Sequence, residues 1–180
     1  MVMVLLLTAG GSAFAHKARP AVASLVLQDN NVLMINLVLN VEAMMAGIGP
    51  DHNPGEFAVA GRYARLRKLP ANDLTIECAG YVSRLIQDMQ LEVNGSLVTP
   101  TFIRCAVPDN ADNSSARLSG IDMRLALPNN AKTFSWRWSR RLGIAAIRLN
   151  AGKQKEQIAY LQPGERSEDL RLTPLEEDAS

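Results

Sequence analysis

The amino-acid sequence predicts a mainly β protein, a β-sandwich of immunoglobulin-like type with short helical insertions between the early strands. Three observations support this fold class. Short segments rich in Val, Leu and Ile recur along the chain and are separated by turn signals. Helical periodicity is concentrated between the first predicted hairpin and the second. The 180 residues are 47% hydrophobic, which is enough for one folded domain, expected over residues 16–174.

The first two predicted strands form a β-hairpin. Residues 21–28 and 32–39 are dense in Val, Leu and Ile and alternate in part with polar residues. The turn sequence Gln28-Asp29-Asn30-Asn31 separates them. Turn residues between two apolar segments of this length are typical of a hairpin.

Three helices are predicted next. Residues 41–46 and 56–68 have helical composition, and the polar loop 51–55 lies between them. A third helix opens at Pro70, and its apolar residues recur at steps of three and four, which predicts one buried stripe. The stripe consists of Leu74, Cys78, Tyr81, Leu85 and Met89.

The rest of the chain is predicted to form strands. Segments 90–93 and 97–106 are joined at Asn94-Gly95, which is a strong hairpin turn signal. After a polar loop, four further short strands are predicted at 116–127, 132–139, 144–149 and 157–161. Within the second of these, Phe134, Trp136 and Trp138 share one face by alternation, and we expect that face in the core.

The two ends of the sequence predict export and a flexible tail. Residues 1–15 form an apolar run that ends in Ala13-Phe14-Ala15, a pattern typical of a cleaved signal peptide. Cleavage there makes His16 the mature N-terminus and the protein periplasmic or otherwise extracytoplasmic. The positive n-region is missing, so we expect that the true start lies upstream or that the start is wrongly assigned, and an uncleaved anchor is the less favoured alternative. Residues 175–180 are predicted to be an acidic flexible tail.

The two cysteines predict one structural disulfide. An exported chain with an even number of cysteines is expected to pair them, and Cys78 and Cys105 are the only pair. Their spacing fits neither a zinc site nor a Cys-x-x-Cys redox pair. Because Cys78 lies in the helical stripe, the disulfide is expected to link that helix to the sheet.

The N-terminal histidine suggests a metal site. A free α-amine and the imidazole of His16 can chelate one ion, and His52, with Asp51 beside it, can supply further ligands for copper or nickel. The alternative interpretation is that Asp51 and His52 only shape a turn.

Other functions find less support in the sequence. No nucleophile elbow, zinc-protease motif or phosphate loop is present, so we expect no enzyme. Nineteen Lys and Arg against 18 Asp and Glu argue against nucleic acid as a partner. The sequence contains two basic clusters, and the first favours a solvated helix face, or one close to a membrane surface if the domain is tethered. The clusters are Arg62, Arg65, Arg67 and Lys68, and Arg137, Arg140 and Arg141.

Several short strings, taken in their order, resemble the periplasmic domain of HupE/UreJ-type bacterial proteins. They are His16 with Pro20, Asn40-Val41-Glu42-Ala43, Ala46-Gly47-Ile48, Tyr63-x-x-Leu66-Arg67, Leu69-Pro70, Asn94-Gly95, Phe134-x-Trp136-x-Trp138 with Gly143, and Tyr160-Leu161-x-Pro163-Gly164-x-x-Ser167. The resemblance implies an extracytoplasmic β-rich domain, normally followed by a membrane portion associated with nickel or cobalt uptake. The metal-transport motif of that portion has no counterpart here, because Gly49-Pro50-Asp51-His52 matches only its last residues.

Two functional hypotheses follow. The first is a non-enzymatic exported domain that handles copper or nickel through His16, Asp51 and His52, or that serves a membrane metal transporter as an accessory. The second is a structural, partner-binding periplasmic domain without a metal site, which binds through a sheet edge or through the basic helix.

Overall fold

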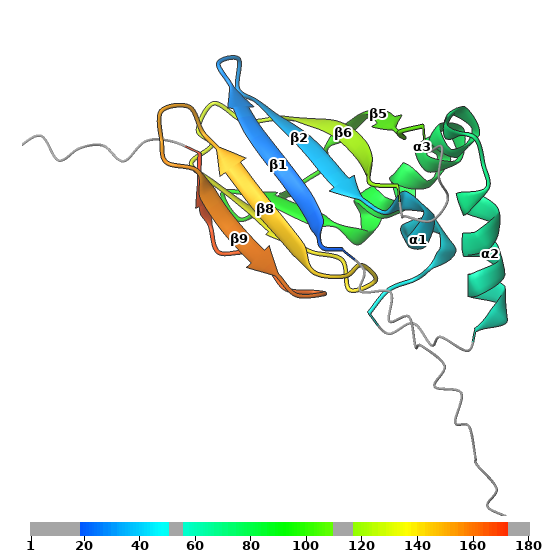
Figure 1. The fold of residues 1–180 in the computed structure, drawn as a ribbon. Coiled ribbons are helices and arrows are strands. Elements are labelled where there is room, and N and C mark those ends of the chain that lie inside the picture. Colours follow the sequence, from blue (N-terminus) through cyan, green and yellow to red (C-terminus); the bar gives the residue numbers. More distant parts are fainter. Residues whose placement is uncertain (1–18, 51–55, 110–116, 173–180) are drawn as a thin grey trace, which may run out of the picture.

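The strands form two sheets that pack around a common core. The computed structural model describes residues 19–50, 56–109 and 117–172. Strands make up 39% of the structure and helices 25%, which confirms the mainly β fold class. The order of the larger sheet is β5-β6-β2-β1-β8-β9, and that of the smaller sheet is β10-β7-β3-β4 (Figure 1).

The strand bounds agree with most of the predicted segments. The larger sheet consists of β1 (Ala21–Gln28), β2 (Val32–Leu39), β5 (Thr101–Ala106), β6 (Ser119–Ala126), β8 (Ala145–Asn150) and β9 (Gln157–Leu161). The smaller sheet consists of β3 (Gln90–Val93), β4 (Ser96–Val98), β7 (Thr133–Arg137) and β10 (Leu170–Arg171). Neighbouring strands are antiparallel except β1 and β8, which pair in parallel. Neither this parallel pair nor β10 was predicted.

Three helices lie together at one end of the two sheets: α1 (Val41–Ala46), α2 (Phe57–Arg67) and α3 (Ala71–Asp88) (Figure 1). Helix α1 begins where the Asn40 side chain accepts a hydrogen bond from the Ala43 amide at 2.9 Å. It ends at Gly47, whose φ of 86° lies in the left-handed region that glycine adopts without strain. None of these helices is long and apolar enough to cross a membrane.

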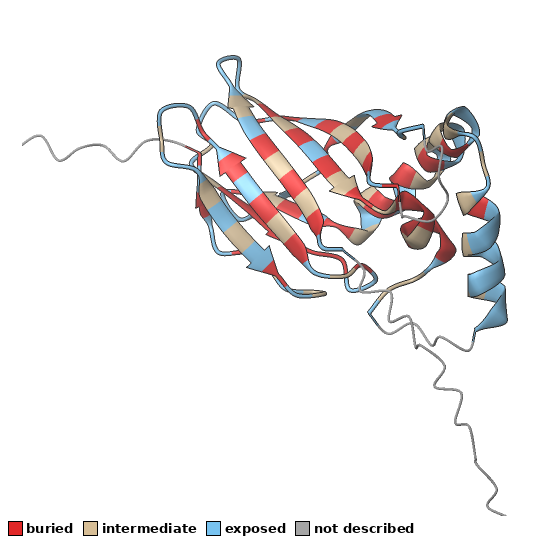
Figure 2. Cartoon of the chain, in the orientation of Figure 1, coloured by how far each residue is buried: buried red, intermediate tan, exposed pale blue. Residues whose placement is uncertain are grey.

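The core is built by alternation along the strands and by one side of each helix. Residues such as Leu25 on β1 and Ile35 on β2 are buried, whereas their chain neighbours are partly exposed (Figure 2). The predicted aromatic face is confirmed, because Phe134, Trp136 and Trp138 are all buried and contact one another edge to face. In α3 the buried stripe contains Val82 in place of Tyr81, which is only half-buried.

The prediction of one strand over 97–106 is wrong. The segment forms β4 in the smaller sheet and β5 in the larger one, so the chain changes sheet at Thr99-Pro100. Proline has no amide hydrogen to donate to a sheet ladder, which explains the break. The predicted hairpin at Asn94-Gly95 is present between β3 and β4, and both turn residues have positive φ.

The predicted disulfide is present and joins α3 to β5. Cys78 lies fully buried on α3, Cys105 lies on β5, and their Cα atoms are 6.4 Å apart. The helical end is therefore covalently linked to the edge of the larger sheet. The signal peptide over residues 1–15 and the tail over 175–180 lie outside the described residues.

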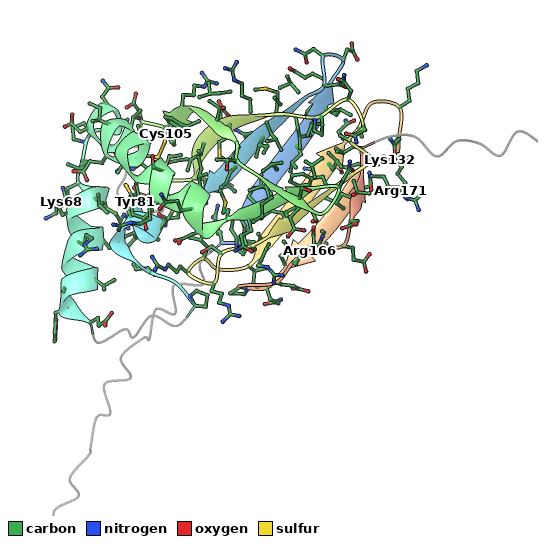
Figure 3. All side chains as sticks on the ribbon, turned by 180° about the vertical axis from the view of Figure 1, so that it is seen from behind. Lys68, Tyr81, Cys105, Lys132, Arg166 and Arg171 are labelled. Atoms are coloured by element: carbon green, nitrogen blue, oxygen red, sulfur yellow. A yellow bond between two sulfur atoms is a disulfide. The ribbon has the colours of Figure 1, made fainter. Side chains whose placement is uncertain are left out.

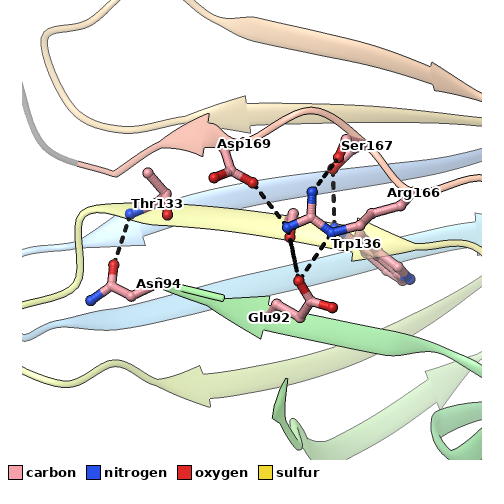
Figure 4. A network of polar contacts seen from close by, with 8 residues as sticks. Glu92, Asn94, Thr133, Trp136, Arg166, Ser167 and Asp169 are labelled. Carbon is pink, nitrogen blue, oxygen red and sulfur yellow. Dashed lines mark hydrogen bonds and ion pairs between the residues drawn. The ribbon is translucent and has the colours of Figure 1, made fainter. Parts of the chain in front are cut away.

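A later segment covers the outer side of the smaller sheet. Arg166 donates hydrogen bonds to Glu92 on β3 at 2.8 and 3.0 Å and to Asp169 at 3.0 Å (Figure 4). The Ser167 hydroxyl accepts from the Trp136 amide at 3.0 Å. These contacts explain why Ser135 is buried on the face opposite the aromatic residues.

Candidate binding groove

The predicted metal ligands cannot be placed. His16, Asp51 and His52 lie outside the described residues, so the shared metal site stays a prediction. Within residues 19–50, 56–109 and 117–172, no three His, Cys, Asp or Glu side chains are grouped as they would be around an ion.

Three adjoining depressions lie at the helical end of the molecule. The first, about 490 Å³, lies between α2 and α3 and also touches Met45 of α1. The second, about 460 Å³, extends to the loop at residues 140–142, and it shares Met45, Arg62, Tyr81 and Arg84 with the first. The third, about 240 Å³, shares Arg140 and Arg141 with the second. Shared walls make the three depressions one groove.

Arginine dominates the lining of this groove. We call it the arginine groove, after Arg62, Arg65, Arg84, Arg137, Arg140 and Arg141. Among the residues that the structure describes, three carboxylates line the same depressions, Glu56, Glu77 and Asp88. Six arginines against three carboxylates give the described lining of the groove a net charge of +3, whereas the whole chain carries +1. The fold therefore concentrates positive charge on one face.

Two of the six arginines form ion pairs with groove carboxylates. Arg65 donates two hydrogen bonds to Glu77 at 2.9 and 3.3 Å. The hydrogen bond from Arg65 lowers the pKa of Glu77, and the same bond raises the pKa of Arg65. Arg141 lies 3.6 Å from Asp88. These pairs are solvent-exposed, so each stabilises the fold only weakly.

The other four arginines have no carboxylate partner among the described residues. They are Arg62, Arg84, Arg137 and Arg140. The Arg84 guanidinium lies over the Tyr81 ring, 5.7 Å from its centroid. Figure 3 shows Tyr81 at the helical end, well away from Arg166. All four side chains are exposed and available to an anionic ligand.

The loop that carries Arg140 and Arg141 is positioned by close packing. Trp138 donates from Nε1 to the Gly143 carbonyl at 2.6 Å, and the Arg141 amide donates to Ser139 Oγ at 3.2 Å. Gly49 lies so close to the Arg141 carbonyl that a Cβ at position 49 would overlap it. The two arginines therefore project from a loop packed against the turn after α1.

A buried ion pair links the helices to the sheet. Arg117, just before β6, donates to Glu42 Oε1 of α1 at 2.6 Å and to the carbonyls of Leu69 at 2.9 Å and Leu66 at 3.1 Å. The two side chains are 5% and 0% exposed. Because the carbonyls belong to the end of α2 and the residues after it, Arg117 fixes α1 and α2 together.

No protein-family model matches the chain, and no curated protein matches it. The groove itself therefore carries the functional argument.

In the sequence, most of the groove arginines fall in two separate clusters, 62–68 and 137–141. We interpreted the first cluster as a solvated helix face. The fold brings Arg62 and Arg65 next to Arg140 and Arg141, and it adds Arg84 from α3. Arg84 is three residues after Tyr81, one helical turn away, but an isolated arginine carries no signal in the sequence.

Proposed function

We propose that this chain is a non-enzymatic, exported, partner-binding domain that serves a membrane protein, with a metal transporter as the expected class. The arginine groove is its contact site. The observation that carries the proposal is the concentration of six arginines in one concave surface of a chain with almost no net charge. Charge of one sign on a surface steers partners of the opposite sign and selects against wrong ones.

Two features support the exported location. The Cys78–Cys105 disulfide fits an oxidising compartment. The apolar segment at residues 1–15 ends in the small residues that signal peptidase sites require. A periplasmic domain with a cationic groove is suited to contact an acidic loop of a membrane protein that faces the same compartment.

Site-specific photo-crosslinking in cells that carry the gene tests this function. A photoreactive amino acid replaces Ser83, which lines the groove, and in a control it replaces Ser24 on the outer face of the larger sheet. We expect position 83, and not position 24, to form an adduct that mass spectrometry identifies as a membrane protein. The charge reversals Arg62→Glu and Arg84→Glu should abolish it. Equal adducts from both positions, or none from position 83, would refute the proposal.

Metal handling is the second candidate, favoured by where the Asp51-His52 segment joins the fold. Pro50 and Glu56, the described residues on either side of it, both line the second depression together with Met44 and Met45. The arginines oppose a cation there, so the affinity has to come from the imidazoles of His16 and His52 and from the mature α-amine.

Titration with Cu(II) and Ni(II) tests the metal candidate. The protein is processed to begin at His16, and the His16→Ala and His52→Ala variants are measured beside it. Tight binding that both variants lose would establish a shared site. Retention of one extra residue before His16 blocks the α-amine and should weaken copper binding strongly. Affinity equal to that of an unstructured peptide with an N-terminal histidine would exclude the site.

A further inference from the structure

We infer that the arginine groove binds an extended acidic segment of another polypeptide, with carboxylates spaced along it. This inference rests on the proposed partner-binding function and names the chemistry that the groove recognises. Its basis is the placement, in all three depressions, of guanidinium groups that have no carboxylate partner among the residues the structure describes.

The distribution of the arginines requires a ligand longer than one anion. Arg62 and Arg84 line the first and second depressions, Arg140 lines the second and third, and Arg137 lines the third. A single phosphate or carboxylate occupies one depression and leaves the remaining guanidinium groups unused. A chain with several carboxylates can follow the shared walls and pair with all of them.

The existing pairs leave room for such a ligand. Arg65 and Arg141 are already neutralised by Glu77 and Asp88, while Arg62, Arg84, Arg137 and Arg140 have no carboxylate partner in the described parts of the chain. The unpaired guanidinium groups are the ones that a ligand neutralises.

Two other classes of anionic partner fit the groove less well. Single-stranded nucleic acid binds to grooves that combine cations with exposed aromatic platforms. Here Trp138 is 1% exposed, and the Tyr81 ring already carries Arg84 on its face. An anionic bilayer attracts basic residues that approach its surface, but a flat bilayer surface cannot follow three adjoining depressions.

Charge-matched variants test the inference in the full-length protein. The probe is a fluorescein-labelled peptide of six Glu alternating with Ser, and the control peptide has Gln in place of each Glu. The groove variant is Arg84→Glu with Arg140→Glu. The matched control is Arg124→Glu with Arg171→Glu, two exposed arginines outside the groove whose side chains form no described ion pair.

Fluorescence anisotropy should show binding of the Glu peptide at about 50 mM salt and weaker binding as the salt rises. We expect the groove variant to lose roughly tenfold or more in affinity, and the control variant, with the same net charge, to change less than about twofold. A third variant, Glu176→Gln with Glu177→Gln and Asp178→Asn, removes the acidic residues of the chain's own tail. It should leave peptide binding unchanged.

Several results would overturn the inference. Equal binding of the Glu and Gln peptides is one, and an equal loss of affinity in the groove and control variants is another. The third is stronger peptide binding when the tail carboxylates are removed, because the chain's own tail would then be the occupant of the groove. Preferential binding to phosphatidylglycerol vesicles or to a single-stranded oligonucleotide would assign the groove to another class. A groove-dependent crosslink to a membrane protein without affinity for the Glu peptide would leave the proposed function intact and refute only this inference.

Discussion

Two arginines make comparable contacts in different surroundings. Arg117 links the helical end to the body of the protein through Glu42, and both side chains are almost completely buried. Arg166 links the segment before β10 to the smaller sheet through Glu92, and these side chains are 32% and 18% exposed. Both arginines also bond to backbone carbonyls or to other side chains. The main difference between the two sites is therefore access to water.

This difference determines what the loss of one partner costs. A charge left alone at the Glu42 site is shielded from bulk solvent, so most of its desolvation penalty appears as lost stability. A charge left alone at the Glu92 site stays partly hydrated. The position of the helices therefore depends on the Arg117–Glu42 pair. The shape of the arginine groove depends on it in turn.

The largest effect is expected from Arg117→Met. It leaves the Glu42 carboxylate buried without a partner, and the Leu66 and Leu69 carbonyls lose their donor. We expect a loss of about 3–5 kcal/mol in the free energy of unfolding, measured by urea denaturation. The double variant Arg117→Met with Glu42→Leu should recover part of the loss. It removes the unpaired buried charge, but the two carbonyls still lack a hydrogen-bond donor. A loss below about 1 kcal/mol in the single variant would show that the site is hydrated.

The next largest effect is expected from removal of the disulfide. The double variant Cys78→Ala with Cys105→Ala removes a covalent link between two residues that are 27 positions apart in the sequence. Loop-closure entropy predicts a loss of roughly 3 kcal/mol in unfolding free energy. If Arg117 by itself positions the helices, the variant should still bind the Glu peptide in the native state. Loss of peptide binding in a folded variant would instead show that the disulfide positions the groove.

A smaller effect is expected from Arg166→Met. Glu92 still receives a hydrogen bond from Ser135 Oγ at 3.2 Å and is accessible to water. We expect a loss of about 1 kcal/mol in unfolding free energy by the same urea assay. A loss as large as that of Arg117→Met would remove the distinction between the two sites.

The smallest effect concerns pH and the more exposed pair Arg104–Asp122. Burial opposes the charged form of Asp122, but hydrogen bonds from Arg104 and Asn36 outweigh it and lower the pKa of Asp122. A lowered pKa contributes stability that is complete above the unfolded value, 3.8, and is lost as the pH falls through the folded value. Between about pH 6 and pH 3, the wild type should therefore lose more stability than Asp122→Asn, by less than about 1 kcal/mol. A steeper loss in Asp122→Asn would reverse the sign of this argument.

Local sequence patterns predicted most helices and strands, because the residues that form these elements also determine where they begin and end. The β1–β2 hairpin, α1 and the Asn94-Gly95 turn follow from alternation, an asparagine cap and residues that tolerate positive φ. The buried face of Phe134 and Trp136 follows from period two. The boundary at Thr99-Pro100 was missed although Pro100 marks it, because apolar residues occur on both sides and only sheet pairing assigns β4 and β5 to different sheets.

The candidate site was less predictable from the sequence than the fold. The metal prediction depends on His16, Asp51 and His52, which lie outside the described residues. The arginine groove combines Arg62, Arg84 and Arg140, residues 22 and 56 positions apart, and no pattern along the chain relates them.

By itself the sequence determined the class of the fold, the pairing of its only two cysteines and most of its strands, because these depend on composition and on contacts close along the chain. Only the tertiary structure decided that Glu42 meets Arg117 in the interior and that arginines from three parts of the chain line one groove. Those arrangements arise because packing the helices against the end of the two sheets sets distances between distant residues, and electrostatic interaction depends on distance and burial rather than on order in the chain.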